Sequence, residues 1–198
     1  MKRYLVVAVC FWLRGVNVLG ELVTMIIPPS VTNPSITQNN EDHYVFYDTD
    51  VLNYVEPSVF VMLPGTYGRP YNLQSLLHRA AHTGYIAIGL TYVNDKPMAS
   101  YCEKSSQKDC YWDSRRTVIF GEQYPSSQLT VSPGNSILNR LYSLLVYLVS
   151  TDVASGIDYT YLLTSNYATS NFVDSLRYDR MAFGGLSQGA LSLHDILI

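Results

Sequence analysis

Residues 59–90 read VFVMLPGTYGRPYNLQSLLHRAAHTGYIAIGL and decide the expected fold. The stretch opens with a continuous apolar run at Val59–Leu63, ended by Pro64-Gly65, which is typical of a strand buried on both faces. A second run of the same kind lies at 85–90. Between the two runs, apolar residues recur at helical spacing, and Gly84 can end the helix. The stretch therefore predicts strand, helix and strand, the crossover unit of a parallel α/β sheet.

The rest of the chain extends this alternation. A short strand is expected at 118–121, an apolar-faced helix over 137–149, and another strand at 180–184 that leads through a turn into a last helical pattern. The predicted fold class is α/β, with a mostly parallel sheet and crossover helices.

The turn after the strand at 180–184 carries the motif GLSQG at 185–189. A G-x-S-x-G motif between a strand and a helix is typical of a nucleophile held on a sharp turn, here Ser187. Gly185 and Gly189 have no side chains, so the backbone can pass close to the turn at these two positions. The amide of Gln188 can face a developing oxyanion. An ordinary glycine-rich turn is the alternative interpretation.

The loop LPGTYG at 63–68 follows the first buried strand and precedes a helix. Serine hydrolases with this kind of sheet donate a second backbone amide to the oxyanion from that position. Thr66 or Tyr67 is the expected donor. Alone, the loop would be interpreted as a turn, but its place before Ser187 favours a role in the site.

Three segments together resemble the core of the α/β-hydrolase-fold serine hydrolases: VFVMLPGTYG at 59–68, HTGYIAIGLTYVND at 82–95 and YDRMAFGGLSQGA at 178–190. The section CEKSSQKDC at 102–110 resembles an exported, esterase- or lipase-like group among them. The resemblance covers residues 44–198.

The resemblance implies a nucleophile at Ser187, oxyanion amides at Gln188 and Thr66, and a histidine base with an acidic partner. It implies a small-molecule carboxylic ester as substrate, with no metal and no organic cofactor. The usual His-Gly before the oxyanion loop is Pro64-Gly65 here, which alters the neighbouring side chains but not the backbone donor.

In that fold class the acid and the base follow the nucleophile along the chain. Because the sequence ends at Ile198, we expect a C-terminally truncated or degenerate domain without its last strands, inactive by itself. Its exposed sheet edge would invite self-association. The histidines present are not expected to act as the base: His43, His78, His82 and His194, the last beside Asp195.

Composition excludes several classes of protein. The chain of 198 residues is 47% hydrophobic and 15% charged, so it can build a core and is not a disordered solvating chain. Its 13 basic and 16 acidic residues give a net charge of −3. Without a basic excess, a nucleic-acid partner is not expected.

Residues 1–20 have the character of a secretory signal. A basic start at 1–3 is followed by an apolar run at 4–13 that is too short to span a bilayer. This predicts a secreted or extracellular protein, with a polar leader at 21–43 before the domain at 44–198. Arg14 follows the run closely, so an uncleaved signal-anchor and a buried strand remain open.

Cys102 and Cys110 are eight positions apart in a polar stretch. In an exported chain this spacing predicts a disulfide. A metal site is not expected, because no second cysteine pair and no nearby histidine supply further ligands. Free surface thiols would instead suit a reducing compartment.

Two function classes follow. The first is an exported serine hydrolase acting on carboxylic esters, and the second is a non-catalytic binding or adhesion domain with an incomplete site. A weaker third interpretation is that the loops, rich in the chain's 17 tyrosines, bind glycans or peptides.

Overall fold

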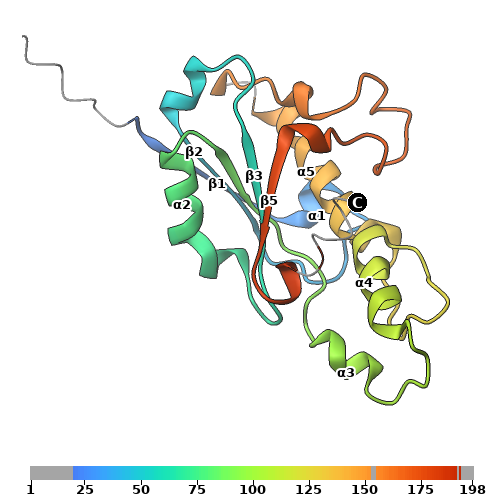
Figure 1. The fold of residues 1–198 in the computed structure, drawn as a ribbon. Coiled ribbons are helices and arrows are strands. Elements are labelled where there is room, and N and C mark those ends of the chain that lie inside the picture. The colour runs from blue at the N-terminus through green and yellow to red at the C-terminus, as the bar shows by residue number, and fades with distance from the viewer. Residues whose placement is uncertain (1–19, 153–154, 191, 193–198) are drawn as a thin grey trace, which may run out of the picture.

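The computed structural model describes residues 20–152, 155–190 and 192, arranged around a five-stranded sheet (Figure 1). The strands are β1 (Leu22–Ile27), β2 (His43–Asp48), β3 (Val59–Leu63), β4 (Ile86–Gly89) and β5 (Met181–Gly185). The α-helices are α1 (Pro29–Thr32), α2 (Gln74–His82), α3 (Met98–Cys102), α4 (Cys110–Phe120) and α5 (Ile137–Thr151). Short 3-10 helices lie at Thr49–Asn53, Pro70–Leu73, Pro133–Asn135, Tyr159–Leu162 and Tyr178–Arg180. The expected signal lies outside the described residues, apart from Gly20.

The sheet is mixed, with the strand order β1-β2-β4-β3-β5. β2 pairs antiparallel with both β1 and β4, whereas β3 pairs parallel with both β4 and β5. The expected mostly parallel sheet of an α/β-hydrolase fold is therefore wrong. The local prediction for residues 59–90 is confirmed as β3, α2 and β4.

The short connection from β2 to β3 explains the mixed direction. Residues 49–58 hold one 3-10 helix and no crossover helix, and a parallel return needs a connection of about a dozen residues or more. The chain therefore reverses between the two strands, and β2 runs against β3 and β4. The apolar runs that predicted the strands carry no information about their direction.

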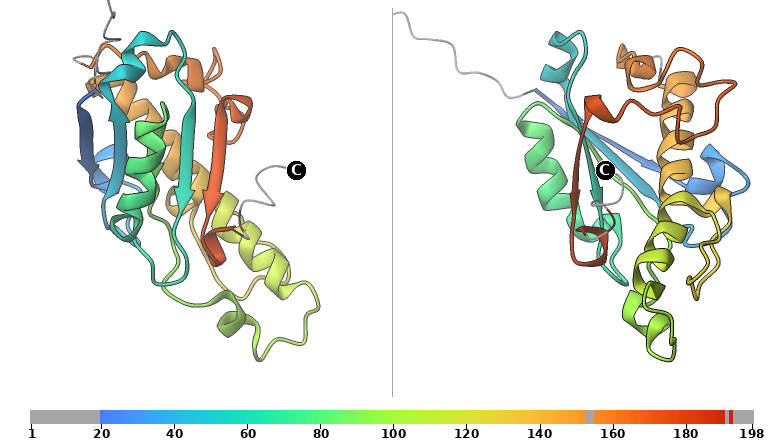
Figure 2. Two further views of the ribbon diagram at one scale, coloured as in Figure 1. Left: turned by 60° about the vertical axis from the view of Figure 1, so that its left-hand side comes forward. Right: turned by 45° about the vertical axis from the view of Figure 1, so that its right-hand side comes forward.

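Side chains of the central strands alternate between two cores. Val61 of β3 and Ile88 of β4 face one core, which α5 covers. Met62 and Ala87 face the other, which Leu77 of α2 covers. Figure 2 shows α2 on one side of the sheet and α4 and α5 on the other. Burial on both faces accounts for the continuous apolar runs of β3 and β4.

The strand expected at 118–121 is instead the end of α4, which Gly121 caps in the left-handed conformation with φ of 73°. Val118 and Ile119 are buried on this helix together with Ser114 and Thr117. The helical period was hidden because polar residues, Ser114 and Thr117 among them, share its buried face.

The expected polar leader at 21–43 contains β1 and α1, and the segment after α1 is bound to α5 and to the 3-10 helix that precedes it. Asn135 Oδ1 accepts the amides of Thr37 and Gln38, each at 2.9 Å. The fully buried Arg140 donates to the carbonyls of Gln38 and Asn39. Burial lowers the pKa of Arg140 to about 10, against the opposing effect of Glu41. The guanidinium therefore stays charged at neutral pH and is satisfied by carbonyl oxygens.

The predicted disulfide is confirmed. Cys102 ends α3, Cys110 begins α4, and their Cα atoms lie 5.8 Å apart. The bond therefore closes the polar loop between two short helices.

Replacing both cysteines with serine is expected to lower the free energy of unfolding by about 2–3 kcal/mol, because the disulfide restricts the unfolded chain. Denaturant unfolding of Cys102→Ser/Cys110→Ser against the wild-type chain measures the difference. Identical unfolding midpoints for the oxidised and the reduced wild-type chain would contradict the prediction.

Candidate active site

Ser187 lies on the sharp turn that its motif predicts. β5 ends at Gly185, helical structure begins at Gln188, and Ser187 between them has a φ of 51°. This left-handed conformation is uncommon for a residue with a side chain and is often kept at functional sites. The Ser187 side chain is exposed, so its hydroxyl is accessible from solvent.

Gly185 and Gly189 are required by close backbone contacts. A Cβ on Gly185 would lie 2.3 Å from the amide nitrogen of Ala190. A Cβ on Gly189 would lie 2.4 Å from the carbonyl oxygen of Leu63, at the end of β3. The turn therefore packs directly against the start of the loop at 63–68, with no space for a side chain.

The loop at 63–68 also contacts Ser187. A Cβ on Gly65 would lie 3.2 Å from the Cβ of Ser187. The Thr66 hydroxyl donates to Oε1 of Gln188 at 2.8 Å, across 122 positions of sequence. The two segments expected to form an oxyanion hole are thus joined in space.

The structure distinguishes the two expected amide donors of this loop. The Tyr67 amide donates to the Asn94 carbonyl at 2.8 Å. Within the described part of the chain, the amides of Thr66 and Gln188 donate to no protein acceptor. Among the described residues, the Thr66 and Gln188 amides thus differ from the Tyr67 amide in having no protein acceptor.

Asn94 and Tyr92 position this loop, and sequence reasoning did not identify them. Asn94 Nδ2 donates to the carbonyls of Gly65 at 2.7 Å and Gly68 at 2.8 Å. The Tyr92 hydroxyl donates to the Pro64 carbonyl at 2.8 Å. Burial raises the pKa of Tyr92, which keeps the hydroxyl protonated as a donor. The available signal for both residues was their place directly after β4, because ligand sites form at the carboxyl ends of parallel strands.

The described histidines do not reach Ser187. His82 Nδ1 lies 3.1 Å from the Asp48 carboxylate, at the end of the sheet opposite to Ser187. His78 packs edge-on against the ring of Phe46, with the ring centroids 4.6 Å apart. The structure describes no hydrogen bond to the Ser187 hydroxyl. His194 and Asp195 lie outside the described residues.

His43 is fully buried, and its Nδ1 accepts the amide of Thr91 at 3.1 Å. Burial lowers the pKa of His43 to about 3, and the positive charge of Arg140 contributes to the shift. His43 is therefore neutral near pH 7. It supports the segment that leads from β4 to Tyr92 and Asn94.

Neither a metal centre nor a membrane span is present in the described ranges. No group of three or more His, Cys, Asp or Glu side chains there could hold a metal ion. No helix there has both the length and the apolar character needed to cross a bilayer.

No protein-family model and no curated protein matches the chain.

Replacing Asn94 with alanine is expected to lower the free energy of unfolding by about 1–3 kcal/mol, because the Gly68 carbonyl loses the Asn94 donor and the buried Gly65 carbonyl keeps only the Gly68 amide. Asn53→Ala is the control, since the Asn53 amide makes an exposed hydrogen bond to the Asp50 carbonyl. It should change stability by about 0.5 kcal/mol or less. Urea unfolding measures both variants, and equal losses would refute the positioning role of Asn94.

The buried neutral His43 predicts acid sensitivity. The pKa falls from 6.5 to about 3 on folding, so between these pH values the unfolded chain binds a proton that the folded chain does not. Stability should therefore fall as the pH drops below 6.5, by up to about 1.4 kcal/mol per pH unit from this group. His43→Asn keeps an acceptor for the Thr91 amide but cannot be protonated. Urea unfolding from pH 6 to pH 4 should show a shallower slope in His43→Asn, and an unchanged slope would count against the assignment.

Proposed function

We propose that the protein is a serine hydrolase acting on carboxylic esters, with Ser187 as the nucleophile. The observation that carries the proposal is the left-handed turn at Ser187, joined to the loop at 63–68 by the hydrogen bond from Thr66 to Gln188. A strained nucleophile turn and a second loop with an unused amide are the two elements that acyl transfer requires on one side of a carbonyl group.

In this proposal the Ser187 oxygen attacks the ester carbonyl, and the amides of Gln188 and Thr66 stabilise the oxyanion. Removing one such donor typically lowers kcat by about 10²–10³-fold. A base takes the hydroxyl proton and passes it to the departing alcohol. Water then attacks the acyl-enzyme and releases the acid. None of the described side chains lies where it could act as a base for the Ser187 hydroxyl. The base therefore comes from another part of the protein or from a partner.

Export of the protein remains part of the proposal. The disulfide between Cys102 and Cys110 supports it, because such bonds persist in oxidising compartments. The proposed substrate is a small-molecule carboxylic ester. The sheet edge at β5, one of the two edge strands of the described sheet, is the proposed surface for self-association.

A non-catalytic binding domain is the second candidate. The observation that favours it is that the Ser187 hydroxyl lacks a hydrogen-bonded base within the described ranges. A serine hydroxyl without a base is a weak nucleophile near neutral pH. The same two amides would then bind a carbonyl or carboxylate oxygen without turnover.

The test combines a fluorophosphonate probe with p-nitrophenyl ester hydrolysis, both on the full chain. We expect slow turnover and slow probe attachment at Ser187, because a serine hydroxyl without a base is a weak nucleophile near neutral pH. Ser187→Ala should remove both signals. Ser75→Ala, which changes an exposed serine on α2, should keep them.

Peptide mapping by mass spectrometry locates the attached probe. Signals that are equal in the wild-type chain and in Ser187→Ala would rule out the hydrolase and leave the binding domain. Fast turnover that Ser187→Ala abolishes would support the hydrolase and show that a base does reach Ser187.

A further inference from the structure

Two neighbouring cavities form a groove beside the loop at 63–68, here called the tyrosine groove. The larger, of about 330 Å³, is lined by Glu41, Asp42, Tyr44, Arg69, Pro70 and Tyr71. The smaller, of about 180 Å³, shares Glu41 and Arg69 and adds Tyr67, Asn94 and Asp95. The larger cavity falls within the range of small-molecule sites, about 300–1,000 Å³.

The smaller cavity adjoins the loop that carries Thr66. Tyr67 and Gly68, which line its smaller cavity, directly follow Thr66 in the chain. Asn94 lines the same cavity and holds Gly68 through its side-chain amide. The Gly68 amide donates to the Gly65 carbonyl, and Gly65 lies against Ser187, so two contacts connect the smaller cavity to the Ser187 turn, although neither Thr66 nor Ser187 lines that cavity.

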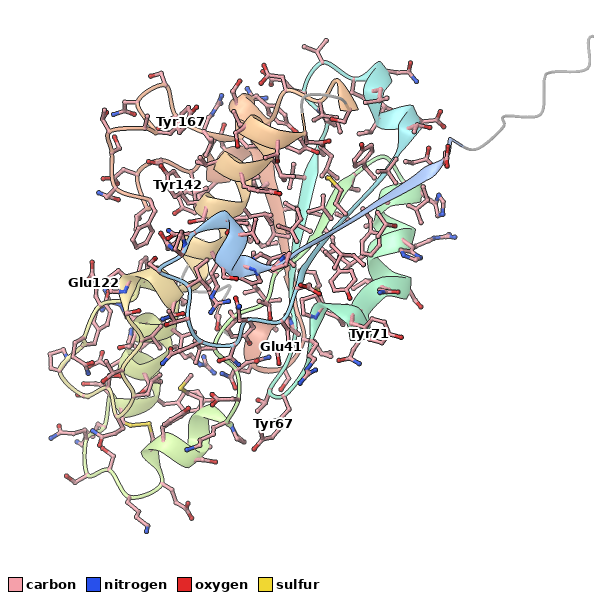
Figure 3. The ribbon with its side chains drawn as sticks, turned by 180° about the vertical axis from the view of Figure 1, so that it is seen from behind. Glu41, Tyr67, Tyr71, Glu122, Tyr142 and Tyr167 are labelled. Carbon is pink, nitrogen blue, oxygen red and sulfur yellow. A yellow bond between two sulfur atoms is a disulfide. The ribbon has the colours of Figure 1, made fainter. Side chains whose placement is uncertain are left out.

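Flat aromatic rings face solvent along the groove. Tyr67 is 68% exposed and Tyr71 is 63% exposed. The ring of Tyr44 lies 6.4 Å from that of Tyr71 and is tilted by 58°, so the two rings form a corner. Figure 3 labels Glu41, Tyr67 and Tyr71, which lie in the same lower part of the molecule. Tyrosine rings combine an apolar face with a polar hydroxyl, as a ligand with apolar and polar surfaces requires.

Tyr67 is held in place at the cost of backbone strain. Its φ of 59° is in the left-handed region, and its amide is fixed to the Asn94 carbonyl at 2.8 Å. A non-glycine residue keeps such a conformation where the surrounding structure requires it, often at a ligand site. The backbone that carries the exposed ring is therefore fixed, which lowers the backbone entropy lost on binding.

The polar groups of the groove suit a neutral ligand with many hydroxyl groups. Arg69 Nη2 lies 3.1 Å from Glu41 Oε1, and both side chains remain partly exposed, so the pair offers donors and acceptors together. Asp42 and Asp95 add acceptors and make the groove net negative. This charge disfavours carboxylates and phosphates, and Arg69 at the centre disfavours cations.

We propose that the tyrosine groove binds a neutral carbohydrate chain. The C–H faces of the sugar rings lie against Tyr67 and Tyr71, and the hydroxyl groups meet the Arg69–Glu41 pair. This groove proposal rests on the proposed function and names the substrate class of the same site. The substrate is an ester between an acyl group and a sugar hydroxyl. Hydrolysis at Ser187 would release the acid and restore that hydroxyl.

The test is affinity electrophoresis of the full chain carrying Ser187→Ala, in gels that contain soluble xylan, glucomannan or mixed-linkage β-glucan. We expect retardation by at least one of these neutral glycans, unchanged in 0.5 M salt because no net charge is neutralised on binding. Tyr71→Ala and Tyr67→Gly should each weaken the affinity by about tenfold. Tyr54→Ala, which removes a ring 59% exposed and outside the groove, is the matched control and should bind normally.

Lack of retardation by all three glycans would overturn the proposal, as would retardation that Tyr71→Ala leaves intact. Salt-sensitive binding of a lysine-rich peptide without glycan binding would identify a cationic ligand instead and equally overturn it. Because Ser187→Ala cannot turn over an ester, glycan binding is read separately from the hydrolase. Retardation without any Ser187-dependent probe attachment in the parent chain would support the groove and refute the proposed function.

Discussion

The close approach of the ends of β3 and β5 is the constraint on which the candidate site depends. At Gly65 and Gly189 the two chain segments approach so closely that a Cβ would meet atoms of the other segment at 3.2 Å or less. This contact forces Ser187 into a left-handed turn and brings Thr66 to Gln188. The parallel pairing of β3 with β5 sets this geometry, because it places both strand ends at one edge of the sheet.

Features encoded over short stretches were predictable from the sequence. The strands at 59–63 and 86–89, with the helix between them, follow from apolar periodicity and a glycine cap. The turn at Ser187 follows from glycines that flank a serine after a strand. The bond between Cys102 and Cys110 follows from spacing in a polar loop. Each signal lies within about a dozen residues, where backbone geometry and sequence pattern are directly linked.

Features set by distant partners could not be predicted in the same way. The direction of β2 depends on a short connection, whereas its apolar pattern fits either direction. The end of α4 resembled a strand because polar Ser114 and Thr117 share its buried face. Asn94 holds the loop at 63–68 from almost thirty positions away. Nothing in the neighbourhood of these residues along the chain specifies such contacts.

The long sequence separation of the site's contacts has a consequence for the order of folding. β1 and β2 can pair as soon as residue 48 is available, but Arg140 binds the Gln38 carbonyl across 102 positions, and Thr66 binds Gln188 across 122. Contacts between distant segments form late, because a long loop must close first. During synthesis the sheet therefore begins to form while the candidate site is still absent. The Thr66–Gln188 contact becomes a marker of completed folding, absent from any partly folded chain in which β5 has not docked.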